Sequence, residues 1–122
     1  MKALNELVEE IKQHPEYYKA GMILCHNGVV RQTSRDGRAV SGLTVAVDRH
    51  RLEEIVHAQK KRQGIVEILV EINEGEDLAI GDDVMFIVVA GDIRETVLSV
   101  LSDTLDQIKS TVTRKTEFFL SS

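Results

Sequence analysis

The chain has 122 residues, of which 43% are hydrophobic and 29% charged, a composition typical of globular domains. At this length we expect a single domain over residues 1–122 that buries about two-thirds of the unfolded surface. The net charge of −5 argues against general nucleic-acid binding, which relies on a cationic face, but it leaves room for a local basic pocket.

No apolar run reaches the ~18 residues that a membrane span requires. Three glutamates also interrupt the N-terminal segment, where a signal peptide needs a continuous apolar region. We therefore expect a cytoplasmic protein that does not bind membranes. The single cysteine, Cys25, excludes an internal disulfide and argues against a cysteine-based metal cluster.

The first half of the chain predicts a helix followed by two strands. Residues 3–13 carry apolar residues at helical spacing and stop at His14-Pro15, because the residue before proline avoids the α region. Residues 21–30 read as a strand with Gly28 as a bulge or close-approach point. Residues 31–38 are polar and contain Asp36-Gly37, a hairpin signal, before a second strand over residues 39–47.

Asp48 can cap a second helix that runs to about Arg62, with Gly64 as its stop. Residues 65–72 alternate as a strand, and the acidic residues 73–83 form a connection. Residues 84–90 are apolar throughout, as in a central strand covered on both faces.

Asp92 and Glu95 resemble a capping box that starts a helix of about 17 residues. Residues 112–120 could form a strand or an extended tail. The order α-β-β-α-β-β-α predicts an α+β fold with helices on a mostly antiparallel sheet, and an αβ plait with other strand pairing remains open.

Lys109 closes the long helix and is followed by Arg114 and Lys115. One interpretation is a solvated helix end, where cations favour the macrodipole. The other is an anion pocket in which Lys109 acts as nucleophile or acid, if burial lowers its pKa. Residue spacing does not separate the two.

Three arginines, Arg31, Arg35 and Arg38, lie in or next to the polar hairpin segment. One interpretation is that they are ordinary exposed residues. The other is that they bind an oxyanion, whose shape matches the fork of a guanidinium group. Arg94 lies in the first turn of the long helix, where the dipole disfavours a cation. A bound anion or an intersubunit salt bridge would offset that penalty.

Arg94 and Lys109 are fifteen residues apart on one helix, which is about 22 Å at a rise of ~1.5 Å per residue. They cannot line the same small pocket within one subunit. A functional role for both residues therefore predicts a homodimer.

Nothing in the sequence predicts a metal or cofactor site. The four histidines show no ligand spacing, and the acidic residues lack the D-x-D-x-D-G pattern of a calcium loop. Cys25 and His26 are neighbours on a strand and point to opposite faces, which disfavours a nucleophilic pair. We expect Cys25 to be a buried structural residue.

An ordered series of runs resembles the catalytic (large) subunit family of molybdopterin synthase. Residues 24–31, LCHNGVVR, resemble the family's V-x-F-x-G-x-V-R, with Gly28 and Arg31 matched. Residues 52–56, LEEIV, resemble a helix near an A-E-I-V pattern. Residues 72–82, INEGEDLAIGD, resemble the connection H-R-x-G-x-L-x-x-G-E.

Two further runs complete the series. Residues 91–94, GDIR, occupy the place of the family's S-A-H-R at a helix start. Residues 108–109, IK, occupy the start of L-K-x-x-x-P-x-W-K at its end. The family histidine is Ile93 here, the family aromatic is His26, and the second family lysine falls at Thr116, one residue after Lys115.

The resemblance implies an α/β hammerhead-type fold and a homodimer that binds two small ubiquitin-like sulfur-carrier subunits as a heterotetramer. The implied reaction moves sulfur from the carrier's thiocarboxylate to cyclic pyranopterin monophosphate, giving molybdopterin, with no cofactor. Lys109 would be catalytic. Lys115 would also be catalytic if the segment that follows the long helix is one residue shorter here than in the family. By the resemblance, Arg31 and the partner's Arg94 would bind the substrate, and Arg38 in the same loop as Arg31 would assist them. The alternative is a non-catalytic family member that binds a pterin or a partner.

Overall fold

The computed structural model describes residues 1–120 and contains two three-stranded antiparallel sheets. The larger sheet has the order β1-β5-β3, formed by β1 (Met22–Val29), β5 (Asp83–Gly91) and β3 (Ile65–Ile72). The smaller has the order β4-β2-β6, formed by β4 (Leu78–Ala79), β2 (Val40–Val47) and β6 (Thr113–Phe119). The predicted α+β class is confirmed, and the strands divide between two sheets instead of forming one plait.

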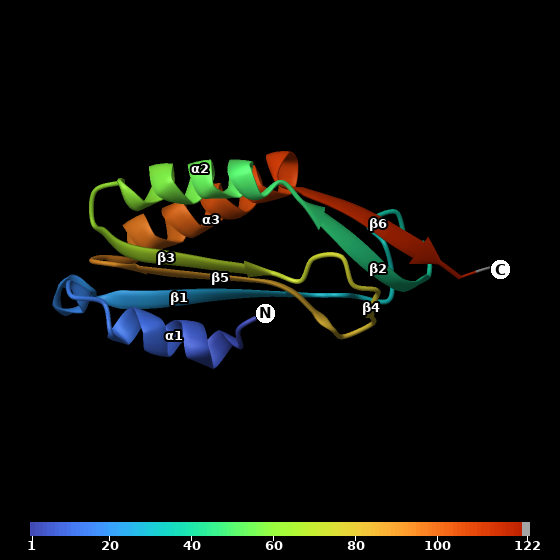
Figure 1. Ribbon diagram of the computed structural model, residues 1–122, viewed down its shortest axis with the longest axis horizontal. Helices are drawn as coiled ribbons and strands as arrows, with labels where there is room; N and C mark the ends of the chain where they lie inside the picture. The colour runs from blue at the N-terminus through green and yellow to red at the C-terminus, as the bar shows by residue number, and fades with distance from the viewer. Residues whose placement is uncertain (121–122) are drawn as a thin grey trace.

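Three α-helices cover the larger sheet: α1 (Leu4–Lys12), α2 (Arg49–Lys60) and α3 (Arg94–Thr111). Figure 1 shows α2 and α3 on one face, α1 on the other, and the smaller sheet extending beyond them toward the C-terminus. A short 3-10 turn, η1 (Tyr17–Lys19), connects α1 to β1. No helix within residues 1–120 is long and apolar enough to cross a membrane.

The strand β5 lies at the centre of the core, as its apolar sequence predicts. Ile87 and Val89 pack in the layer beneath α2 and α3, whereas Phe86, Val88 and Ala90 pack with α1. All five are at most 4% exposed, and each large apolar side chain buried in this way contributes about 1.5–3 kcal/mol. The larger sheet therefore lies between two helical layers, and β5 contributes buried side chains to both.

The two longer helices begin differently. The carboxylate of Asp48 accepts a hydrogen bond from the backbone N–H of Arg51 at 3.0 Å, so the predicted cap of α2 is confirmed. The predicted stop at Gly64 is wrong, because α2 ends at Lys60 with Lys61 as its C-cap, whereas Gly64 (φ +88°) lies directly before β3. The capping box predicted for α3 is wrong, because the N-cap is Ile93 and the Asp92 carboxylate accepts only from the adjacent Ile93 N–H.

The Asp36-Gly37 turn forms, but it does not pair the strands on either side of it. Gly37 has φ +88° and donates its N–H to the Ser34 carbonyl at 3.0 Å, and one isolated bridge joins Thr33 to Ala39. β1 pairs with β5 and β2 pairs with β6, so the two strands that flank the turn belong to different sheets. The last segment, left open between strand and tail, is the strand β6.

Candidate functional site

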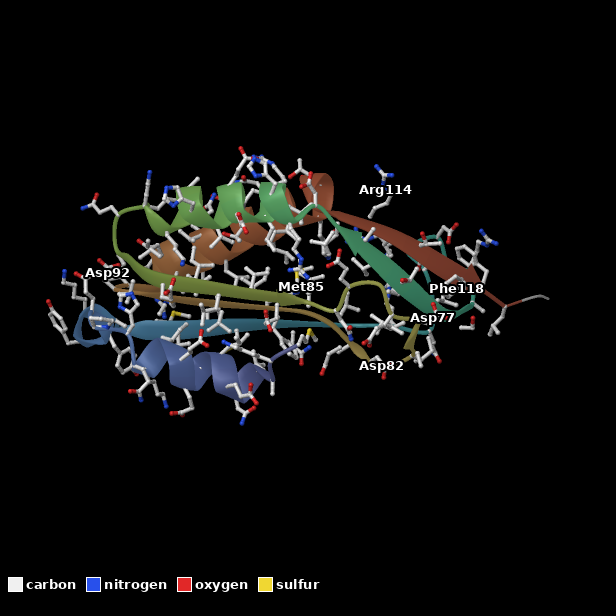
Figure 2. All side chains as sticks on the ribbon, in the orientation of Figure 1. Asp77, Asp82, Met85, Asp92, Arg114 and Phe118 are labelled. Atoms are coloured by element: carbon white, nitrogen blue, oxygen red, sulfur yellow. The ribbon has the colours of Figure 1, made fainter. Side chains whose placement is uncertain are left out.

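A pocket of about 410 Å³ lies between the two sheets, where α3 ends. Its apolar wall includes Leu43 and Val45 of β2 and Val84 and Met85 of β5. Figure 2 shows Met85 in the middle of the molecule, between the larger sheet and the helices. Its polar residues come from four segments and are His26, Arg35, Lys109, Thr113 and Lys115. No carboxylate lines it among the residues that the structure describes.

Lys109 reaches this pocket from the last turn of α3. Its neighbour Ile108 is completely buried and anchors the helix end in the core, while the Lys109 side chain remains exposed. The cation is also well placed for the helix macrodipole, which is negative at this end. Within residues 1–120, Lys109 has no ion-pair partner, so its charge faces the pocket.

The register of β6 decides which side chains of the exit strand face the pocket. Lys115 pairs with Val45, which itself lines the pocket, whereas Thr116 pairs with Thr44. Successive residues of a strand point to opposite faces, so Thr113 and Lys115 line the pocket and Thr116 does not. Figure 2 shows Arg114 directed outward from β6. Positions 115 and 116 were the two candidates for the second family lysine. Position 115 lines the pocket with Lys109, and it carries a lysine.

His26 is the pocket residue whose role sequence reasoning missed. Its Nε2 atom is buried and has no hydrogen-bond partner among the described residues. Burial, and then the charge of Lys109, keep the pKa of His26 below its usual range. The sequence signal was present, because the alternation of β1 places His26 and Gly28 on one face and both line the pocket.

Of the three arginines in or near the hairpin segment, only Arg35 lines the pocket. Arg31 is exposed outside the pocket lining. The Arg38 guanidinium carbon lies 3.6 Å from the centroid of the Phe119 ring, a cation–π contact between the loop and the end of β6. The proposed binding roles of Arg31 and Arg38 remain predictions.

Arg94 begins α3, at the end of the helix far from the pocket. Its side chain is 74% exposed and its only described ion pair is a 3.5 Å contact with Glu95. Figure 2 shows the neighbouring Asp92 at the opposite end of the molecule from Phe118. Within one chain, then, Arg94 and Lys109 do not share a site.

Cys25 corrects one expectation, because its side chain is exposed rather than buried. It lies on an outer strand of the larger sheet, and partial burial raises the pKa of its thiol. Within residues 1–120, no group of three or more His, Cys, Asp or Glu side chains is arranged to hold a metal ion.

Comparison with protein families matches residues 1–111 to the family described as MoaE protein. The match ends with α3, so β6 and Lys115 lie beyond it. Comparison with curated proteins finds no match.

Solved structures with the same fold include the following three. The molybdopterin synthase of Staphylococcus aureus has 20% identity and a TM-score of 0.73, covering 90% of this chain and 87% of that one. The complex of subunits 1 and 2 of the molybdopterin-converting factor of Helicobacter pylori has 18% identity and a TM-score of 0.71, over 99% and 86%. Molybdopterin cofactor biosynthesis protein E of Burkholderia multivorans has 20% identity and a TM-score of 0.75, over 98% and 87%.

Proposed function

The chain belongs to the MoaE protein family, and from this premise we propose that it is the large, catalytic subunit of a molybdopterin synthase. It acts in molybdenum cofactor biosynthesis. The reaction transfers sulfur from the thiocarboxylate of a small ubiquitin-like carrier subunit to cyclic pyranopterin monophosphate and gives molybdopterin. No cofactor takes part. The fold shared with the Staphylococcus aureus molybdopterin synthase supports this proposal.

The convergence of Lys109 and Lys115 on one pocket is the observation that carries the proposal. Arg35 adds a third cation, and no described carboxylate lines the pocket to neutralise them. Such a cluster attracts anions even on a chain whose net charge is −5. Both reactants are anionic, one through its phosphate and the other through its thiocarboxylate.

The two lysines can divide the chemistry between them. The ammonium group of Lys109 can donate a proton to the substrate atom that gains negative charge during sulfur transfer, and we assign this general-acid step to Lys109. An ammonium group stabilises negative charge that develops on the reacting oxygen or sulfur, and we assign this role to Lys115. Lys115 is half exposed and 3.9 Å from the Glu117 carboxylate, so it is held loosely in this position.

The arginines extend the site beyond the pocket. Arg31 and Arg38 flank Arg35 in sequence, and we assign them to the part of the substrate that projects from the pocket mouth. Arg94 is about 22 Å from Lys109 along α3, and it contributes from the second chain of a homodimer. The complete site thus needs two copies of this chain.

The assembly that follows is a heterotetramer of two such chains and two small carrier subunits. The Helicobacter pylori structure, a complex of subunits 1 and 2 of its converting factor, supports a two-component assembly. A cytoplasmic location and a single domain over residues 1–122 belong to the same proposal.

The direct test is conversion in vitro. Purified protein, a thiocarboxylated carrier and cyclic pyranopterin monophosphate should yield molybdopterin, measured as its fluorescent oxidation product. The matched control is Lys12→Ala, an exposed lysine on α1, across the larger sheet from the pocket. The absence of product with every small-subunit partner would refute the enzymatic proposal.

A second candidate is a non-catalytic family member that binds a pterin or a partner. The observation that favours it is Ile93, a 55% exposed apolar residue where the resembled family has a histidine. In that case Lys109→Ala leaves binding and cellular function unchanged. A large loss of cellular function in Lys109→Ala, with carrier binding intact, would decide for the enzyme.

A further inference from the structure

The buried nitrogen of His26 is unexplained by the fold. His26 Nε2 has no hydrogen-bond partner among the described residues, and a buried polar group left unpaired destabilises the fold. A Cβ atom at position 28 would lie 3.3 Å from this nitrogen, so Gly28 leaves the ring the space it occupies. The ring lines the same pocket as Lys109, so the unpaired nitrogen is available to a ligand there.

Three cations from three segments line the pocket, and the charge of Lys109 acts on the His26 ring. Lys109 comes from α3, Lys115 from β6 and Arg35 from the loop before β2, while the pocket residues of β2 and β5 are apolar. Two carboxylates lie beside the pocket without lining it, and one of them offsets part of the charge of Lys115. Asp83 accepts a hydrogen bond from the Asn27 side chain at 3.0 Å, and Glu117 lies 3.9 Å from the Lys115 ammonium.

This environment disfavours a further positive charge on the His26 ring. Burial first, and Lys109 second, hold the pKa of His26 below the ordinary value of 6.5. The ring is therefore neutral at pH 7 in the free protein. An anion that enters the pocket offsets the surrounding charge and removes the electrostatic reason for neutrality.

We propose that His26 is an anion-binding residue of this pocket, which takes up a proton from solvent as an oxyanion enters and donates a hydrogen bond to it from Nε2. The proton returns to solvent when the anion leaves, so no other reactant is needed. The inference rests on the proposed function, because it gives that pocket a further binding residue. The oxyanion is the phosphate of the pterin substrate or the carboxylate-type group of the carrier tail.

The consequence is an affinity that depends on pH. Since the pKa of His26 is higher in the complex than in the free protein, affinity is constant at high pH. It rises as pH falls through the pKa of the complex, by about tenfold per unit, and levels off below the pKa of the free protein. An aromatic ring that only fills space gives no such dependence.

Nuclear magnetic resonance of the imidazole Cε1–H groups tests this directly. We expect the pKa of His26 to rise when sulfate or acetate is added, relative to sodium chloride at the same ionic strength. Sulfate does not titrate in this range, so any change belongs to the protein. His50 is 86% exposed on α2 and serves as the internal control. A pKa of His26 that stays unchanged with both anions would overturn the proposal.

The two anions distinguish the two sources. A rise with sulfate alone indicates the phosphate of the pterin, and a rise with acetate alone indicates the carrier tail. Lys109→Met should raise the pKa of His26 in the free protein, because it removes the neighbouring positive charge. No change in this variant would contradict the electrostatic account of the pocket.

Two variants complete the test by calorimetry, with sulfate binding measured in buffers of different ionisation enthalpy. The native chain should take up a proton on binding, while His26→Phe should bind more weakly and take up none. His26→Gln keeps a donor without titration and should bind sulfate at the same affinity at every pH between 5.5 and 8. Undiminished proton uptake in both variants would refute the role of His26. Neither measurement needs sulfur transfer, so a failed conversion assay leaves this result independent.

Discussion

The two ends of α3 carry similar sequences and have opposite surroundings. At the C-terminal end, Ile108 is fully buried and Lys109 faces a pocket built from both sheets. At the N-terminal end, Ile93 is 55% exposed and Arg94 projects 74% into solvent. The same pair of residue types, an isoleucine followed by a cation, thus has two outcomes. At the C-terminal end the buried isoleucine fixes the lysine at a pocket, and at the N-terminal end the arginine lies outside that pocket in its own chain. The difference arises because only the C-terminal end lies against the smaller sheet.

The largest effect should come from removing the cation of the anchored end. Lys109→Met keeps most of the side-chain volume and should lower the turnover of the conversion assay by about 10²–10⁴-fold, the usual worth of a positioned acid–base group. Carrier binding should change little. A loss below tenfold would show that the C-terminal end of α3 is not the reacting centre.

The second test asks whether the exposed end completes a site in another chain. Arg94→Ala and Lys109→Met should each be inactive as homodimers. If the site spans two chains, mixing and re-equilibrating them yields heterodimers with one intact site, and about a quarter of the native activity should return. Mixing either variant with Lys12→Ala controls for exchange. No recovery in exchanged heterodimers would mean that Arg94 and Lys109 act in the same chain or not together.

A matched pair of core truncations compares the stability of the two ends. Ile108→Ala removes a fully buried side chain and should lower the free energy of unfolding by about 2–5 kcal/mol. Ile93→Ala removes an exposed one and should change it by less than about 0.5 kcal/mol. Urea unfolding followed by circular dichroism measures both. Equal losses would show that Ile93 is covered in solution, as in a dimer interface.

The smallest effect concerns the missing cap of α3. Ile93 occupies the N-cap position with φ −126° and ψ 153° and makes no capping bond. Ile93→Ser supplies a hydroxyl acceptor for the free N–H groups of the first turn, and it should stabilise the fold by about 0.5–1 kcal/mol. The same unfolding measurement applies, with Asp48→Ala at the capped helix α2 as the converse, expected to lose about 1 kcal/mol. A destabilised Ile93→Ser would again indicate a covered isoleucine.

Most elements of the fold could be read from local patterns. The apolar run of β5 and the cap at Asp48 each depend on a few neighbouring residues, and both appear as predicted. The Asp36-Gly37 turn failed to join its flanking strands, because strand pairing is chosen by contacts distant in sequence. The N-cap of α3 is Ile93, one residue after the predicted Asp92.

The sequence alone determined the class of fold, the family resemblance, and the placement of Lys109 and Arg94 at opposite ends of one helix, since helix rise is a local property. Tertiary structure decided the pocket. It brought Lys115 to face Lys109 through the pairing of β6 with β2, and it placed His26 and Arg35 beside them while leaving Arg31 outside. Strand register and the junction of the two sheets decide which side chains line the pocket. Neither is encoded in the spacing of residues along the chain.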